Sequence, residues 1–158
     1  MKQIPLTGKH GIGKFALVDN EDFDRVNQYR WWLWKVGNDY YPTGWIGNKN
    51  IPLHQFITGA KNVDHRNGNT LDSQRLNLRI CTHQQNCCNR KKCSISSRSQ
   101  YKGVRWSTQM KKWQSYITSK GKSIYLGSFE EEINAAQAYN DAATVHHGEF
   151  ARLNLIGE

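Results

Sequence analysis

The chain contains no long apolar run. Its 158 residues include no stretch near the ~18 consecutive apolar residues of a membrane span. The first residues, MKQIPLTGKHGIGK, also lack the apolar centre of a signal peptide. We therefore expect a soluble, intracellular protein, in the cytoplasm or nucleoid of a host cell, with no membrane partner. In such a reducing compartment the cysteines should be thiols; they are Cys81, Cys87, Cys88 and Cys93.

Acidic residues are absent from the middle of the chain. No Asp or Glu occurs from Ser73 to Phe129, and the whole chain has a formal net charge of +9. A solvated surface normally mixes both signs, so this imbalance predicts contact with a polyanion, most often nucleic acid. A basic surface that serves only solubility is the alternative. The basic residues of this stretch are Arg75, Arg79, Arg90, Lys91, Lys92, Arg98, Lys102, Arg105, Lys111, Lys112, Lys120 and Lys122.

Two familiar ligand-binding motifs are also missing. The cysteines have the spacing C-x5-C-C-x4-C, without the C-x-x-C pair of a structural zinc site. The N-terminal GKHGIGK resembles part of a phosphate-binding loop, but it does not fit G-x-x-x-x-G-K-[ST] and no clear helix follows it. We therefore expect neither structural zinc nor a nucleotide-binding loop of that type.

The first of four predicted segments, residues 1–50, is rich in aromatic side chains. FALVD (15–19) is typical of a short strand, and the acidic residues that open EDFDRVNQYRWWLW (21–34) favour a helix start. The aromatic residues beyond predict strands joined by hairpins, with Asn38-Asp39 and Thr43-Gly44 as turn signals. We interpret these aromatic residues mainly as core, with base stacking as the alternative. The segment is thus either a structural brace or a second DNA-binding surface.

Residues 51–90 predict two short strands and a helix. A strand ending in VDH leads into the turn Asn67-Gly68, LNLRI is the second strand, and Thr82 suits the N-cap of a helix that follows. Residues 91–100 form a predicted basic, serine-rich linker. Around it, four basic residues would lie along a phosphate backbone: Arg90, Lys91, Lys92 and Arg98.

Residues 101–158 predict a three-stranded antiparallel sheet followed by one helix. The three strands are YKGVRWS, KWQSYITS and SIYLGSF, separated by the turn-like TQMK and SKGK. Ser128 and Glu131 have the spacing of a capping box, and Gly148 suits the helix end. Several alanines would let the helix pack close to the sheet. The whole chain is therefore predicted to be an α+β protein.

The stretch VDHRNGNTLDSQRLNLR (63–79) carries the candidate chemistry. Asp64 and His65 are adjacent, so on a regular strand they would face opposite sides and could share a site only where the strand ends. Asn67-Gly68 supplies that break. Histidine is a natural general base near neutral pH, and oxygen atoms of Asp and Asn suit a hard ion such as Mg²⁺. A plain polar turn is the alternative reading of the Asp-His pair.

Several spaced elements between Ile51 and Arg90 resemble the HNH nuclease motif in its H-N-N form, found in phage and intron homing endonucleases. They are Asp64-His65, Asn77 and Asn86, with the words PLHQFI, VDHRNGN and LDSQRLNLRICTHQQN. The resemblance implies a ββα-metal fold, in which His65 is the general base and Asn77 orients it. Asp64 and Asn86 would hold one Mg²⁺ or Mn²⁺. Asn86 stands where many relatives have a third histidine, which disfavours zinc.

Two further histidines are accessory candidates. His54 could line or brace the site, with a half-buried histidine on an apolar strand as the alternative. His83 could reach a phosphate, since it lies three residues before Asn86 on the predicted helix.

From Tyr101 to about Leu155 the chain resembles the plant apetala-type, ethylene-response-factor-like DNA-binding domain. The matching words are YKGVRW, KWQSYI, YLGSF, AAQAYNDAA and GEFARLN. The resemblance implies that the sheet lies in the major groove of double-stranded DNA. Ser107, Thr118 and Ser123 replace arginines typical of plant members, which leaves base specificity open. The implied contact residues are Lys102, Arg105, Trp113, Tyr116 and Tyr125; for Trp113 and Tyr125, sheet packing is the alternative.

Together these patterns predict a site-specific DNA endonuclease of the homing type, a hydrolase encoded by a phage or mobile element. Its C-terminal domain would hold it on its target, and no obligatory protein partner is evident. The alternative is a DNA-binding transcriptional regulator with a degenerate nuclease core. A restriction-type nuclease would differ in target length and partners.

Overall fold

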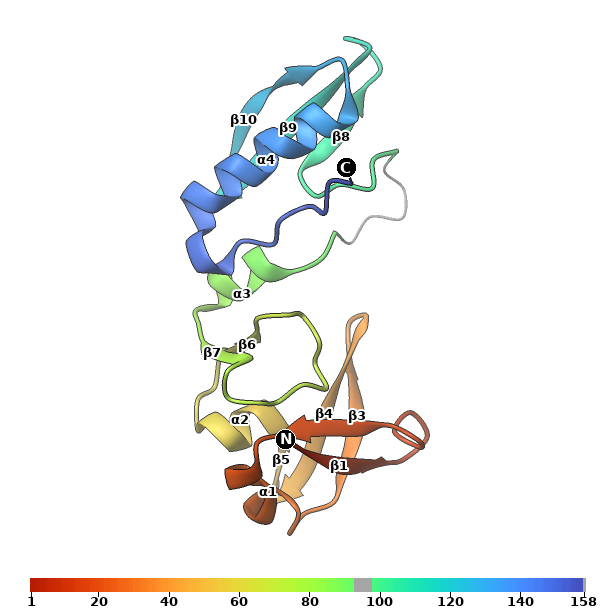
Figure 1. Cartoon of the computed structure of the whole chain (residues 1–158), viewed down its shortest axis with the longest axis vertical. Coiled ribbons are helices and arrows are strands. Elements are labelled where there is room, and N and C mark those ends of the chain that lie inside the picture. The colour runs from red at the N-terminus through yellow and green to blue at the C-terminus, as the bar shows by residue number, and fades with distance from the viewer. Residues whose placement is uncertain (93–97, 158) are drawn as a thin grey trace. The chain divides into compact units, whose positions relative to one another are not determined.

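The computed structural model describes residues 1–92 and 98–157. The chain divides into two compact units, Met1–His83 and Gln84–Glu158 (Figure 1). Elements of the predicted segments 1–50 and 51–90 share the first unit and one hydrophobic core. Residues 93–97, half of the predicted linker 91–100, lie outside the described residues, so the four-segment division stays a prediction. Within the described residues no helix is long and apolar enough to cross a bilayer.

The first unit is built on a five-stranded sheet of order β2-β1-β3-β4-β5. β1 pairs antiparallel with β2 and parallel with β3, and the other neighbours are antiparallel. The predicted strand at FALVD and the predicted helix after it are confirmed, whereas β1 was not predicted. The elements are β1 (Lys2–Thr7), β2 (Phe15–Val18), α1 (Asn20–Val26), β3 (Trp31–Val36), β4 (Asp39–Ile46), β5 (Lys49–Pro52) and α2 (Leu53–Thr58).

The predicted turn at Thr43-Gly44 is wrong. Both residues lie inside β4, where Thr43 pairs with Pro52 and Gly44 with Ile51. The glycine serves packing, because a Cβ there would lie 3.0 Å from the Trp31 ring. The chain reverses instead after Ile46, at Gly47, whose φ of +59° is a left-handed conformation that glycine adopts without strain.

A small hairpin and a helix follow in the order β6 (Val63–His65), β7 (Leu78–Ile80) and α3 (His83–Asn89). The long loop between β6 and β7 is attached to β2. The Leu17 amide donates to the Leu71 carbonyl at 2.8 Å, and the Ser73 amide donates to the Leu17 carbonyl at 2.9 Å. Backbone hydrogen bonds therefore hold this polar loop against the sheet.

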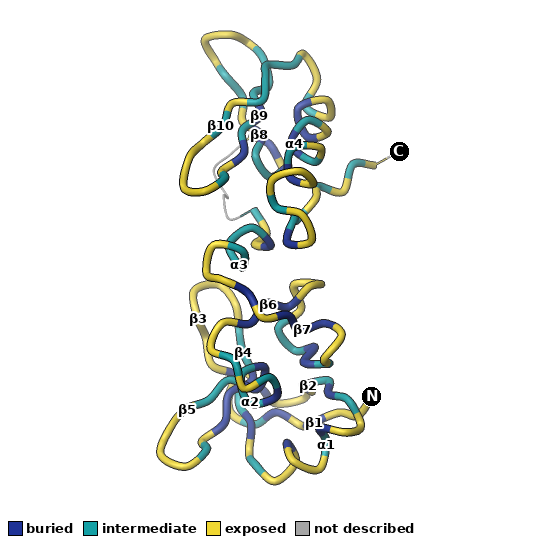
Figure 2. Tube along the Cα trace, turned by 90° about the vertical axis from the view of Figure 1, so that its left-hand side faces the viewer, coloured by how far each residue is buried: buried dark blue, intermediate teal, exposed yellow. Residues whose placement is uncertain are grey.

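In the second unit, α4 lies along one face of a three-stranded antiparallel sheet, as predicted (Figure 1). The contact side is buried, with Ala135, Ala136, Tyr139 and Ala143 at 2% exposure or less (Figure 2). The small alanines allow the close approach, and the α+β class is confirmed. The elements are β8 (Val104–Ser107), β9 (Lys112–Ser119), β10 (Lys122–Phe129), α4 (Glu132–His147) and a 3-10 turn (Gly148–Phe150).

The predicted capping box at α4 is wrong. The N-cap residue is Glu131, and it makes no side-chain capping hydrogen bond. Ser128 belongs to β10, which continues to Phe129, and its hydroxyl lies 2.7 Å from the Tyr125 hydroxyl. Pairing with β9 therefore takes Ser128 out of reach of the helix start.

Candidate functional site

Asp64 and His65 end strand β6, and both are 5% exposed. The carboxylate Oδ2 of Asp64 accepts hydrogen bonds from Nη2 of Arg79 at 2.6 Å and from its Nε at 2.8 Å. Arg79 is the cross-strand partner of Asp64 on β7, and its side chain is also buried. The pair neutralises two charges that burial would otherwise make costly.

The chain turns immediately after His65, as Asn67-Gly68 predicted. The Gly68 amide donates to the His65 carbonyl at 2.8 Å, and Gly68 has a φ of +70°. Asn77 then bridges the loop: its Nδ2 donates to the Asp72 carbonyl at 2.7 Å, and its Oδ1 accepts from the Asn67 amide at 3.0 Å. The buried Asn77 side chain thus holds together the loop that begins at His65.

The ring of His65, the candidate general base, lies close to the rings of His54 and Tyr41. The ring centroids of His54 and His65 lie 5.1 Å apart, and Tyr41 lies 5.6 Å from His54 and 6.3 Å from His65. His54 lies on helix α2, so the alternative reading, a half-buried histidine on an apolar strand, does not describe it. Pro52 at the N-cap and Gly59 in the left-handed conformation at the C-cap delimit this short helix. Within the described residues, Nδ1 of His54 has no hydrogen-bond partner.

Both imidazoles are held in the neutral form. Burial lowers the pKa of His65 to about 4, against the opposing effect of the Asp64 and Asp72 carboxylates. Burial, with the neighbouring His65, lowers the pKa of His54 to about 3. A neutral imidazole has a lone pair and can accept a proton, which is what a general base requires.

The other predicted site residues lie on α3. His83, exposed, begins the helix, and Asn86 is half-buried within it. The first unit thus brings together Asp64, His65, Asn77 and His54, while Asn86 is assigned to the second unit. The joint binding of an ion by Asp64 and Asn86 stays a prediction. Among residues 1–92 and 98–157, no group of three or more His, Cys, Asp or Glu could hold a metal.

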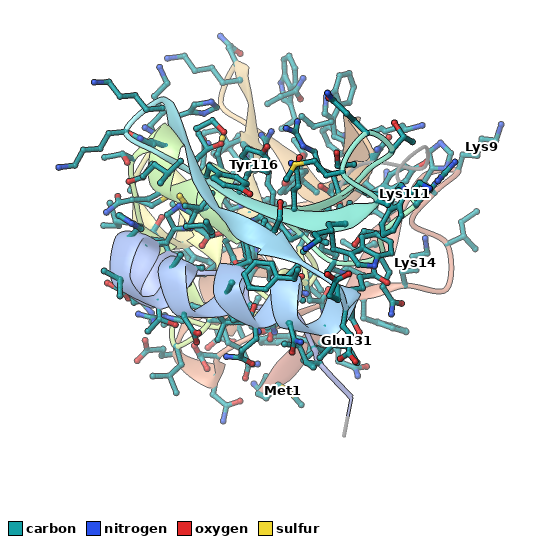
Figure 3. The ribbon with its side chains drawn as sticks, turned by 90° about the horizontal axis from the view of Figure 1, so that it is seen from above. Met1, Lys9, Lys14, Lys111, Tyr116 and Glu131 are labelled. Carbon is teal, nitrogen blue, oxygen red and sulfur yellow. The ribbon has the colours of Figure 1, made fainter. Side chains whose placement is uncertain are left out.

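The sheet of the second unit presents a polar aromatic face, which we call the tyrosine face: Arg105, Gln114, Tyr116 and Tyr125. The Arg105 guanidinium lies 4.0 Å from the centroid of the Tyr116 ring, whose centroid is 5.2 Å from that of Tyr125. Figure 3 shows Tyr116 on the side of the sheet away from α4. Nη2 of Arg105 donates to the Tyr116 hydroxyl, and Tyr125 is 51% exposed, so the remaining guanidinium donors and the two rings can contact a partner here.

Trp113 points the other way. It pairs with Trp106 at a centroid distance of 5.0 Å and packs against the core formed by Tyr101, Val104 and the α4 alanines. The alternation of side chains along β9 puts Trp113 and Tyr116 on opposite faces. The sheet-packing alternative therefore describes Trp113, and we place it outside the proposed DNA-binding surface.

Two predicted phosphate-binding lysines are already bound by the protein. Nζ of Lys92 donates to the carbonyls of Ser99 at 2.8 Å and Tyr101 at 2.7 Å. Nζ of Lys102 donates to the carbonyls of Cys88 and Arg90, and these bonds join the end of α3 to the turn that precedes β8. A phosphate would have to compete with these bonds. Arg90, Lys91 and Arg98 are exposed.

Sequence reasoning missed Arg79 and Tyr41 as neighbours of the site. Arg79 faces Asp64 in the hairpin register, so placing both strand ends correctly would have found it. Tyr41 belongs to a distant strand, and no local pattern connects it with His65. Cys81, Cys87 and Cys88 are thiols, as expected, and Cys93 lies outside the described residues.

No family model and no solved structure matches the chain. An uncharacterised HNH endonuclease of Acanthamoeba polyphaga mimivirus is 33% identical over 155 residues, which cover 92% of this chain and 78% of the viral protein. Protein 3.8 of Escherichia phage T7 is 32% identical over 120 residues, 76% of this chain and 84% of the phage protein.

A shorter segment is similar to plant proteins. An AP2-like ethylene-responsive transcription factor of Arabidopsis thaliana is 39% identical over 61 residues, which are 39% of this chain but 13% of the plant protein. The viral relative, in contrast, extends over most of both chains. The chain therefore belongs to the HNH endonuclease family and contains an AP2-like segment in its C-terminal part.

Proposed function

We propose that the chain is a DNA endonuclease of the homing type that hydrolyses a phosphodiester with His65 as general base. The observation that carries this proposal is the placement of His65: it ends β6 beside Asp64, is held neutral by burial, and begins a loop that Asn77 bridges. An immobilised neutral imidazole can take the proton of an attacking water with little reorganisation.

The donor chemistry of the proposed ion site fits Mg²⁺ or Mn²⁺. Asp64 and Asn86 offer a carboxylate and an amide oxygen, which hard divalent ions prefer. Such an ion stabilises the charge that develops on the phosphodiester oxygens. We propose a ββα-metal arrangement of β6, β7 and α3 for these residues. Asn77 would orient His65 through the loop, and His54 would support its ring as an accessory residue, with His83 available to a phosphate.

The second unit would hold the enzyme on double-stranded DNA through its tyrosine face. Arg105 can donate two hydrogen bonds to a guanine edge, and Tyr116 and Tyr125 add contact area. The exposed Arg90, Lys91 and Arg98 would follow the phosphates. Attachment of this surface to the nuclease raises the local concentration of the site near its target. The AP2-like similarity supports this arrangement.

Nicking of supercoiled plasmid DNA with Mg²⁺ tests the proposal. We expect the parent chain to relax or linearise the plasmid, and His65→Ala to lower the rate at least about 100-fold, because loss of a general base typically costs that much. His146→Ala is the matched control, since His146 is an exposed histidine of α4. Equal rates for the parent and His65→Ala would refute the proposed role of His65.

One observation favours the alternative, a DNA-binding regulator with a degenerate nuclease core. Asp64, the proposed ligand, is engaged by Arg79 through two short hydrogen bonds. If the protein is such a regulator, it would bind DNA specifically but leave every plasmid and candidate site intact with either Mg²⁺ or Mn²⁺. Binding and cleavage measured on the same DNA therefore separate the two functions.

A further inference from the structure

Three tryptophans lie on the outer face of the sheet in the first unit. Along β3 the side chains alternate, so Trp31 and Leu33 enter the core while Trp32 and Trp34 face outward. Trp34 is 55% exposed and Trp45, on β4, is 57% exposed. Large aromatic side chains gathered at the surface are typical of a binding site. We call Trp32, Trp34 and Trp45 the tryptophan row.

The strand register makes this row continuous. Trp32 pairs with Thr43 and Trp34 pairs with Tyr41 across the antiparallel strands β3 and β4. Trp45 lies two residues beyond Thr43 on the same face, which makes it a diagonal neighbour of Trp32 at roughly 7–8 Å. Outward side chains along each strand are about 7 Å apart, so each ring can meet a separate planar group.

An open surface depression of about 610 Å³, which we call the cavity, adjoins one end of the row. Its volume lies within the range of small-ligand sites. Trp32 and Trp45 contribute aromatic walls, the Gln28 amide can donate and accept hydrogen bonds, and Arg30 brings a positive charge. This combination suits a planar, hydrogen-bonding group attached to an anion, as in a nucleotide. The lining residues are Thr7, Gly8, Gln28, Tyr29, Arg30, Trp32 and Trp45.

The other end of the row reaches the candidate catalytic residues. Tyr41, the strand partner of Trp34, has its ring centroid 6.3 Å from that of His65. Charge also favours a nucleic acid strand: Arg30 lines the cavity beside Trp32 and Trp45, and the whole chain has a net charge of +9.

We infer that the tryptophan row and its cavity bind unpaired nucleotides of the DNA strand that is being cut. Bases that flank the scissile phosphate would stack on Trp34 and Trp45, and one base would enter the cavity. A tryptophan face stacks on any base, so the row would favour locally opened DNA without reading its sequence. The inference rests on the proposed function in one respect: His65 marks where the cut phosphate lies.

The test compares fluorescently labelled duplexes with and without an unpaired tract of a few thymidines, by anisotropy in EDTA so that no cleavage occurs. We expect the parent chain to bind the interrupted duplex more tightly. Trp34→Ala and Trp45→Ala should each lower affinity for it at least about fivefold, with little change for the paired duplex. Trp34→Tyr, which keeps an aromatic ring, should retain most of the preference.

Two controls make the result specific. Tyr125→Ala, on the tyrosine face, should weaken binding to both duplexes and leave their ratio unchanged. His65→Ala should keep the preference even where cleavage is lost, so failure of the nuclease proposal and failure of this inference are distinguishable. Circular dichroism of each variant checks its folding, which the exposure of Trp34 and Trp45 should leave intact.

Equal affinity of the parent chain for the two duplexes would overturn the inference, as would tryptophan variants that keep the parent's preference. A second copy of this chain is the competing occupant of the face. If sedimentation shows a parent dimer that Trp34→Ala and Trp45→Ala convert to monomer, with no effect on the duplex ratio, the row is a self-association surface and the inference is wrong.

Discussion

At the scale of the residue, the ion pair between Asp64 and Arg79 decides the state of the candidate site. Both side chains are at most 7% exposed, so neither charge has water as a substitute partner. The arginine also compensates the carboxylate charge beside His65, whose imidazole burial keeps neutral. Arg79 therefore stabilises the folded site. A cation that binds Asp64 would have to share its carboxylate with Arg79.

Arg79→Met should destabilise the first unit by about 3–5 kcal/mol, because it leaves the Asp64 carboxylate buried without its cation. Urea denaturation, followed by far-UV circular dichroism, measures the change. The double variant Asp64→Leu with Arg79→Met removes both charges and should recover much of the loss. If the double variant is less stable than Arg79→Met alone, the ion pair is not the cause.

At the scale of the element, the loop between β6 and β7 is attached to helix α1. Arg75 of the loop donates from Nε and Nη2 to the two carboxylate oxygens of Asp22, at 2.7 and 2.9 Å. Arg25 donates to the same carboxylate at 2.6 Å. The Asp22 side chain is 2% exposed. The burial of this carboxylate alone would raise its pKa, but the two guanidinium groups outweigh it and lower the pKa below 3.8.

This attachment predicts an acid-sensitive contribution to stability. Because the folded pKa of Asp22 is lowered, the contribution is complete above the unfolded pKa of about 3.9 and is lost as the pH falls through the folded value. Asp22→Asn should cost on the order of 2 kcal/mol at pH 7. The difference from the parent chain should shrink below pH 4, as urea denaturation at several pH values would reveal; a constant difference would contradict the assignment.

At the scale of the whole molecule, the net charge of +9 should govern binding to DNA. The logarithm of the affinity should fall with the logarithm of salt concentration by about 0.9 per phosphate neutralised.

Arg105→Ala should reduce both affinity and specificity at one base position, whereas Arg98→Ala should reduce the salt slope by about one without changing the preferred sequence. Anisotropy titrations between 50 and 300 mM salt, ~50 mM apart, measure both. Identical slopes for parent and Arg98→Ala would exclude that phosphate contact.

The sequence predicted much of this architecture because several signals were local. The alternating strands of the second unit, the alanines of α4 and the turn at Asn67-Gly68 each act within a few residues, and each is confirmed. Strand β1 was missed because Pro5 interrupts its pattern and its parallel partner, β3, is distant in sequence. Helix α2, which carries His54, was not predicted because a six-residue helix is too short for a helical period to show.

The candidate site was predictable only in part, because only some of its residues lie close together in the sequence. Asp64, His65 and Asn77 belong to one hairpin and its loop, so their spacing in the sequence carried the resemblance to the HNH motif that related them. Tyr41 and His54 reach His65 through tertiary packing that no spacing encodes. Lys92 was predicted to lie along phosphates because of its charge and Lys102 to contact DNA because of the family resemblance, but neither signal reveals the backbone carbonyls to which both lysines donate.

The tight turn after His65 also bears on the chemical ageing of the protein. An Asn-Gly pair deamidates when the glycine backbone nitrogen attacks the side-chain carbonyl carbon of the asparagine, which closes a succinimide and releases ammonia, and water then opens the ring to a carboxylate. Here the Gly68 nitrogen donates to the His65 carbonyl, and Nδ2 of Asn67 donates to Asp72 at 2.9 Å. Both reacting groups are restrained, so we expect Asn67 to deamidate more slowly in the folded protein than after unfolding in urea, which peptide mass spectrometry would measure. Deamidation would place a carboxylate at position 67 beside the Asp72 carboxylate, in place of the present hydrogen bond. The hydrogen bonds that shape the loop therefore also protect the loop from deamidation.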